Sequence, residues 1–162
     1  MSEPFVYIAS DIMSYGSQCE AKRIEDICDR VGIPFYSARL NMEINDKKAC
    51  SAEENAKLPE KIVKHDTAMI DKATIFVVNY KPSSIGTIVE LGQIFEKWRN
   101  DNTIKVYGLY DDIRRTNIPE VGDRRSFGMN AYAFGVLATM SDTNELYELE
   151  DLEAALTSLV EK

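Results

Sequence analysis

A glutamate that follows the strongest apolar segment of the chain is the first residue able to do chemistry. Glu90 comes after the run TIFVVNY at 74–80 and the tight loop KPSSIG, in the opening turn of a helix expected over 87–100. The positive end of the helix dipole keeps a carboxylate there ionised, as an oxygen nucleophile requires. Gly86 lets the backbone turn sharply and leaves room for a ligand. Thr87-x-x-Glu90 is also a capping-box spacing, so a purely structural role for the glutamate stays open.

An aspartate lies on the apolar face of a second expected helix. By helical periodicity Asp66 shares this face with Ile62, Met69 and Ile70. Burying a carboxylate on this face costs free energy unless the carboxylate is paired or hydrogen-bonded, so Asp66 is a candidate for a positioned acid. A position at the edge of the face, with the side chain in solvent, fits the pattern equally. Tyr7, near the end of the first expected strand, has a hydroxyl that could bond a carboxylate, but strand tyrosines also serve in packing alone.

Apolar runs that alternate with helical patterns must position these residues. Strands are predicted at 5–9, 34–37, 74–80, 104–109 and 136–140, and helices at 17–31, 59–73, 87–100, 127–134 and 149–160. This alternation predicts one α/β domain over 1–162, flavodoxin-like or Rossmann-like, with a parallel sheet of about five strands and helices on both faces. The polar stretches 39–57 and 111–125 are expected to be irregular loops.

Ligands of such folds bind in the crevice at the carboxyl ends of the strands. Ser10 and Asp11 follow the first expected strand, and Ser84 and Gly86 follow the central one. We therefore expect these four residues to line a binding site together with Glu90.

The ordered set of these features resembles the nucleoside 2-deoxyribosyltransferases. The resemblance covers most of the chain and is carried by Tyr7, by Asp66-x-x-x-Ile70, and by Gly86-Thr87-x-x-Glu90-Leu91-Gly92 after the central strand. It implies that Glu90 is the nucleophile and forms a covalent deoxyribosyl-enzyme intermediate. It further implies that Asp66 assists the departure or positioning of the base, and that Tyr7 hydrogen-bonds the nucleophile.

The same resemblance implies partners for the chain. The substrates would be 2′-deoxynucleosides and free nucleobases, with no metal and no organic cofactor. The segment Asn130–Val136 resembles one whose asparagine reaches into a neighbouring subunit's site, which implies a homo-oligomer with sites completed across subunits.

One position departs from the pattern of the family: Ser84 stands where family members commonly carry an aspartate that contacts the base. Base preference is therefore not implied.

The composition and charge of the chain argue against several classes of function and location. The formal net charge of −8 and the lack of a basic stretch argue against binding to a nucleic-acid polymer. No apolar run approaches the roughly 20 residues of a membrane span, and the first residues resemble no signal peptide. The odd number of cysteines, three, shows no metal-ligand spacing and fits reduced thiols, so a cytoplasmic location is expected.

Two other functions fit the same pattern. A nucleoside or nucleotide N-glycosidase would use Glu90 with water in place of the second base, and a non-catalytic nucleotide-binding module would keep only the pocket. The arginine pairs within 111–125 are expected to form solvated ion pairs, with phosphate binding as the alternative. His65, next to Asp66 in sequence, is expected to point away from it toward the surface.

Overall fold

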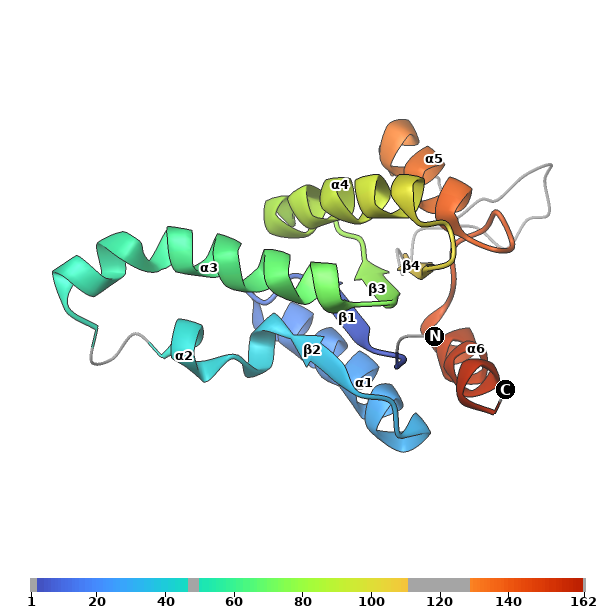
Figure 1. Ribbon diagram of the computed structural model, residues 1–162, viewed down its shortest axis with the longest axis horizontal. Coiled ribbons are helices and arrows are strands. Elements are labelled where there is room, and N and C mark those ends of the chain that lie inside the picture. The colour runs from blue at the N-terminus through green and yellow to red at the C-terminus, as the bar shows by residue number, and fades with distance from the viewer. Residues whose placement is uncertain (1–2, 47–49, 111–128, 162) are drawn as a thin grey trace.

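A parallel sheet of four short strands lies at the centre of the molecule (Figure 1). The computed structural model describes residues 3–46, 50–110 and 129–161. The strands lie in the order β2–β1–β3–β4, with bounds β1 Val6–Ser10, β2 Phe35–Ser37, β3 Ile75–Asn79 and β4 Lys105–Leu109. Every residue of β3 is buried, as expected of a central parallel strand that is covered on both faces.

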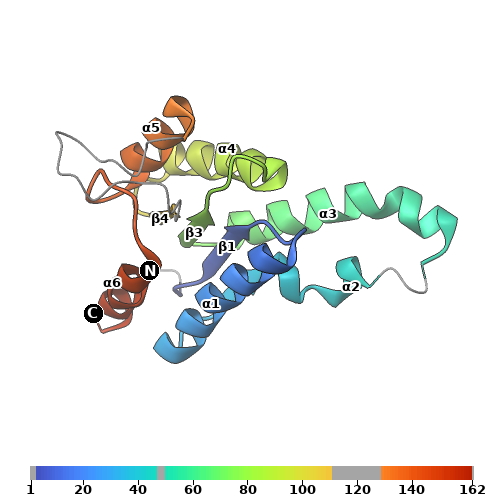
Figure 2. The same cartoon turned by 180° about the vertical axis from the view of Figure 1, so that it is seen from behind.

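Helices cover both faces of this sheet, which Figures 1 and 2 show from opposite sides. On one face lie α1 (Tyr15–Val31) and α6 (Leu149–Val160), and on the other lie α3 (Ala52–Lys72), α4 (Ile85–Asn100) and α5 (Ala131–Met140). Side chains alternate between the faces, so Val6 packs toward α1 whereas Tyr7 packs toward α3 and α4. None of the helices in the described ranges combines the length and apolar character needed to cross a membrane.

The predicted α/β class, with a parallel sheet and helices on both faces, is confirmed, but the described sheet has four strands instead of about five. The run at 136–140, predicted as the fifth strand, is the second half of α5. Its buried residues Val136, Leu137 and Met140 fall on one side of a helix at this spacing. Asn130 caps the helix by accepting hydrogen bonds from two backbone N–H groups of the first turn.

The prediction of an irregular loop over 39–57 is wrong for much of this segment, which includes the end of η1 (Ala38–Leu40), α2 (Met42–Asn45) and the first turns of α3. Helix α3 begins after Ser51 because Ser51 and Glu54 form a capping box, in which each side chain bonds the other residue's backbone N–H. Pro59, predicted in the first turn, lies well inside this helix. The predicted loop 111–125, with its arginine pairs, lies outside the described residues.

A buried ion pair joins α1 to the end of β2. Glu25 of α1 is 3% exposed, accepts a hydrogen bond of 2.6 Å from the Ser37 hydroxyl, and is paired with the guanidinium of Arg39. These partners satisfy a carboxylate whose burial would otherwise be costly. They hold the segment after β2 against α1, and this segment borders the cavity described below.

Candidate active site

A cavity of about 390 Å³ opens at the carboxyl ends of β1 and β3, between α3 and the start of α4. This is the edge at which ligands of parallel α/β folds bind. Its walls include most of the residues that the sequence singles out, namely Ser10, Asp11, Asp66, Ser84, Gly86 and Glu90. Residues more than fifty positions apart in sequence are thus brought to one hollow.

Glu90 is held by a tyrosine of the sheet and not by its own helix. Tyr7, fully buried on β1, donates a hydrogen bond of 2.8 Å to Oε1 of Glu90. Helix α4 begins at Ile85, so Glu90 lies in its second turn, not the opening turn that the sequence predicts. The capping-box alternative is wrong for the same reason: Thr87 lies inside the helix, where its hydroxyl accepts a hydrogen bond of 2.7 Å from Ser84.

The surroundings of Glu90 disfavour its charge, whereas the sequence predicts a carboxylate that the helix dipole keeps ionised. Burial raises the pKa of this carboxyl from 4.5 to about 7, the negative charge of Asp66 raises it as well, and the hydrogen bond from Tyr7 lowers it. Burial first, and then the charge of Glu90, also raises the pKa of Tyr7, so its hydroxyl stays protonated and donates. Near neutral pH the site therefore offers a carboxylate that is ionised in part, poorly solvated and fixed in direction, as a nucleophile requires.

Asp66 lies on the inner side of α3, as its helical spacing predicts. Its side chain is 17% exposed, and Oδ1 accepts a hydrogen bond of 2.7 Å from the hydroxyl of Tyr36. The ring of Tyr36 on β2 lies 5.4 Å from that of Tyr7, its partner in the register of the two strands. The sequence does not predict Tyr36 as a site residue, because only the register of β1 and β2 places it beside Tyr7 and Asp66.

His65 is also closer to the site than the sequence predicts. Its side chain is 35% exposed, its ring centroid lies 5.2 Å from that of Tyr36, and Nδ1 lies 3.4 Å from Oδ1 of Asp66. The expectation that it points away to the surface is therefore wrong. The aromatic ring of Tyr36 gives the imidazole a packing surface, which turns it back toward the neighbouring aspartate.

The two residues predicted to follow the first strand have different surroundings: Ser10 is the last residue of β1, and Asp11 follows it. Both carboxylate oxygens of Asp11 are used locally, by the backbone N–H of Met13 at 3.0 Å and by the hydroxyl of Ser17 at 2.6 Å. This arrangement fixes the turn into α1. Ser10 accepts a longer contact of 3.4 Å from the side-chain amide of Asn79, at the end of β3. Asp11 thus shapes the cavity wall, and Ser10 joins the ends of β1 and β3.

The two predicted residues before Glu90 lie at the start of α4. Ser84 is the N-cap residue and is 6% exposed, but its side chain makes no capping hydrogen bond and bonds Thr87 instead. Gly86 lies within the first turn of the helix, so the sharp turn predicted there is wrong. A Cβ at Gly86 would meet no atom within 4 Å, so the glycine widens the cavity.

Asn130 is not part of this cavity. Its Oδ1 accepts from the backbone N–H groups of Tyr132 and Ala133, at 3.0 and 3.2 Å, and it borders a separate apolar hollow of about 640 Å³ between α4 and α5. Its predicted contribution to a neighbouring subunit's site stays a prediction.

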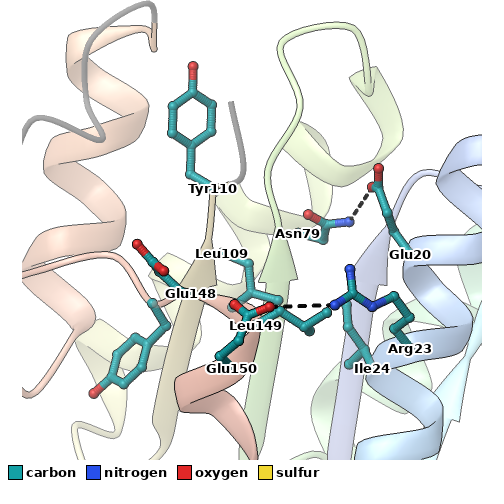
Figure 3. Close-up of a pocket in the computed structure, with 10 residues that line it drawn as sticks. Glu20, Arg23, Ile24, Asn79, Leu109, Tyr110, Glu148, Leu149 and Glu150 are labelled. Carbon is teal, nitrogen blue, oxygen red and sulfur yellow. Dashed lines mark hydrogen bonds and ion pairs between the residues drawn. The ribbon is translucent and has the colours of Figure 1, made fainter. Parts of the chain in front are cut away.

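A smaller hollow of about 100 Å³ lies on the opposite face of the sheet, between α1 and the start of α6 (Figure 3). The figure shows two pairs of polar side chains that face each other: the amide of Asn79 donates to Glu20 at 3.1 Å, and Arg23 lies 3.5 Å from Glu150. This hollow is small and its charges are paired, so the cavity beside Glu90 is the better candidate site. Within the described ranges, no three His, Cys, Asp or Glu side chains are grouped so as to hold a metal ion.

Solved structures share this fold over nearly the whole chain. A conserved protein from Enterococcus faecalis V583 superposes with a TM-score of 0.69 at 20% sequence identity, covering 98% of this chain and 99% of that one. A 2-deoxyribosyltransferase from the psychrotolerant bacterium Bacillus psychrosaccharolyticus superposes with a TM-score of 0.59 at 17% identity, covering 94% of this chain and 95% of that one. By sequence, no family profile and no curated protein matches. The chain therefore shares its fold with a deoxyribosyltransferase.

Proposed function

We propose that this chain transfers 2-deoxyribose between nucleobases, with Glu90 as the nucleophile. The observation that carries the proposal is the carboxylate of Glu90 at the cavity wall, fixed by Tyr7 at 2.8 Å and with a pKa raised to about 7 by burial. The fold shared with a 2-deoxyribosyltransferase supports it. The substrates would be 2′-deoxynucleosides and free nucleobases.

The first half of the reaction forms the covalent intermediate. An oxygen of Glu90 attacks C1′ of the deoxyribose while the bond between C1′ and the base nitrogen breaks through an oxocarbenium-like transition state. In the form of the site that reacts, Glu90 is ionised and Asp66 carries a proton. The electron pair of the broken bond goes to the base, which takes this proton from the carboxyl of Asp66. The products are a glutamyl ester of deoxyribose, the neutral base and the carboxylate of Asp66.

The second half reverses these steps with a different base. A ring nitrogen of the incoming base attacks C1′, the electron pair of the ester bond returns to Glu90, and Asp66 takes back a proton from the base. The missing 2′-hydroxyl makes the oxocarbenium easier to reach, which is why two carboxylates and their hydrogen-bond donors would suffice. Neither half of this scheme needs a metal or an organic cofactor.

A homo-oligomer is part of the proposal. Within one chain Asn130 caps α5 and lies outside the cavity, so it would reach a deoxynucleoside only in a neighbouring subunit's site. Its side-chain amide N–H₂ group is not used in the cap, which engages Oδ1 alone.

Intact-protein mass spectrometry after mixing with 2′-deoxyinosine tests the nucleophile. A deoxyribosyl adduct is expected on the wild type, at Glu90 after peptide mapping, and none is expected on Glu90→Gln. Glu96→Gln is the matched control, because Glu96 lies on the same helix, is exposed and pairs with Arg99. An adduct that persists in Glu90→Gln contradicts the assignment.

Product analysis separates transfer from hydrolysis. With 2′-deoxyinosine and free adenine, a transferase forms 2′-deoxyadenosine, whereas an N-glycosidase releases only hypoxanthine and deoxyribose. The proposal requires deoxyadenosine, formed at a rate that falls in Glu90→Gln and not in Glu96→Gln.

A further inference from the structure

Two tyrosines that are partners across β1 and β2 hold the two carboxylates of the site. Tyr7 donates to Glu90 of α4 at 2.8 Å, and Tyr36 donates to Asp66 of α3 at 2.7 Å. Their rings lie 5.4 Å apart with an interplanar angle of 34°. The sheet thus presents two hydroxyl donors side by side, and each of the two helices supplies one carboxylate.

The hydroxyl of Tyr36 has a defined direction. The side-chain amide of Asn41 donates to its oxygen at 3.4 Å, so a lone pair of that oxygen is used and its proton points to Asp66. Burial is the main cause that raises the pKa of Tyr36, so the hydroxyl keeps its proton. Tyr36 is therefore a donor to Asp66 and not an acceptor from it.

This donor makes the two oxygens of Asp66 unequal. Oδ1 takes the hydrogen bond from Tyr36 and lies 3.4 Å from Nδ1 of His65, whereas Oδ2 accepts no hydrogen bond from the part of the chain that the structure describes. A proton carried by Asp66 on Oδ1 would oppose the proton of Tyr36. The favoured position for it is Oδ2, on a side chain that borders the cavity.

We propose that Tyr36 is a positioning residue for departure of the nucleobase: it holds Oδ1 of Asp66 so that Oδ2 carries the proton given to the leaving base. Tyr36 itself touches no substrate in this scheme and acts through Asp66. The inference rests on the proposed function, since it assumes that a base leaves from this cavity.

Tyr36→Phe removes only the hydroxyl and keeps the ring between Tyr7 and His65. Single-turnover release of hypoxanthine from 2′-deoxyinosine is expected to slow by about tenfold or more, which is a part of the roughly 10²–10⁴-fold that general acid catalysis contributes. In an Asp66→Asn background the same change is expected to slow release by less than about twofold, because the residue through which Tyr36 acts is already altered. Tyr107→Phe, a change at a buried tyrosine on the opposite face of the sheet, is the matched control and is expected to leave release unchanged.

A second substrate tests the role of the proton. 7-Methyl-2′-deoxyguanosine carries a positively charged base that leaves without taking a proton, so Tyr36→Phe is expected to slow its cleavage by less than about threefold. A purely structural Tyr36 would slow both substrates alike and would slow release equally in both backgrounds, and either result overturns the inference. Unchanged release of hypoxanthine overturns it too. A wild type that forms no adduct on Glu90 refutes the proposed function instead, which keeps the two failures distinguishable.

Discussion

Replacing Glu90 by glutamine is expected to stabilise the folded protein at alkaline pH while it removes activity. The wild-type carboxyl is partly buried and lies near the charge of Asp66, so folding opposes its ionisation. Glutamine has nearly the same shape, its amide oxygen can still accept the hydrogen bond from Tyr7, and it carries no charge. The variant therefore removes the cost of a poorly solvated charge and leaves the packing in place.

The raised pKa sets the size and the sign of this effect. A group whose pKa is 4.5 when unfolded and about 7 when folded adds stability that is fully present below pH 4.5 and is lost as the pH rises through about 7. At 1.36 kcal/mol per pKa unit, the loss is about 3 kcal/mol, and most of it falls between pH 5 and pH 8.5. The unfolding free energy of Glu90→Gln is expected to lack this decline.

Urea unfolding at pH 5 and at pH 8.5 measures the difference directly. The gap between Glu90→Gln and the wild type should widen by about 2–3 kcal/mol from the lower to the higher pH. The control Glu96→Gln changes an exposed residue of the same helix and should follow the wild type at both pH values. A gap that stays constant with pH refutes the reasoning, because Glu90 would then ionise as easily in the folded chain as in the unfolded one.

Three further changes test the site and the core. Tyr7→Phe removes the hydrogen bond that lowers the pKa of Glu90, so the rising limb of the pH profile of kcat/KM should move to higher pH and its plateau should fall by about tenfold. Gly108→Ala would place a Cβ 3.0 Å from a methyl group of Leu137, and urea unfolding should show a loss of about 1–3 kcal/mol. Burial raises the pKa of the Cys28 thiol to about 12, so iodoacetamide at pH 8 should modify Cys28 only after urea is added, as peptide mass spectrometry would show.

The sequence predicts the fold wherever the length and the neighbours of an apolar run show whether it is a strand or a helix. The run at 74–80 is apolar throughout and lies between two helical patterns, and it forms β3 with both faces buried. The run at 136–140 is short and contains residues that suit a strand or a helix equally, so its periodicity could not decide between them. The N-cap at Asn130 favours a helix, in which the backbone carbonyls of the first turn accept hydrogen bonds from N–H groups of α5 itself.

The candidate site was predictable only in part, because its residues meet across long stretches of chain. Helical spacing alone places Asp66 on an inner face, and the topology of a parallel sheet places the loops after β1 and β3 together. The bond from Tyr7 to Glu90 joins residues 83 positions apart and was expected only from the family resemblance. The contact of Tyr36 depends on the register between β1 and β2, which neither periodicity nor spacing determines.

That register explains why a site made of few groups can be well ordered. Successive strand residues face opposite sides of the sheet, so Ser37 and Tyr36 point to different faces of β2. Ser37 is bonded to the buried carboxylate of Glu25 on α1, which is also paired with Arg39. This anchor fixes which way β2 faces, and it thereby turns Tyr36 toward Asp66 on the other side of the sheet. A slip of one residue in β2 would break the anchor and turn the Tyr36 hydroxyl away from Asp66, so the ion pair on one face stabilises the geometry of the carboxylates on the other.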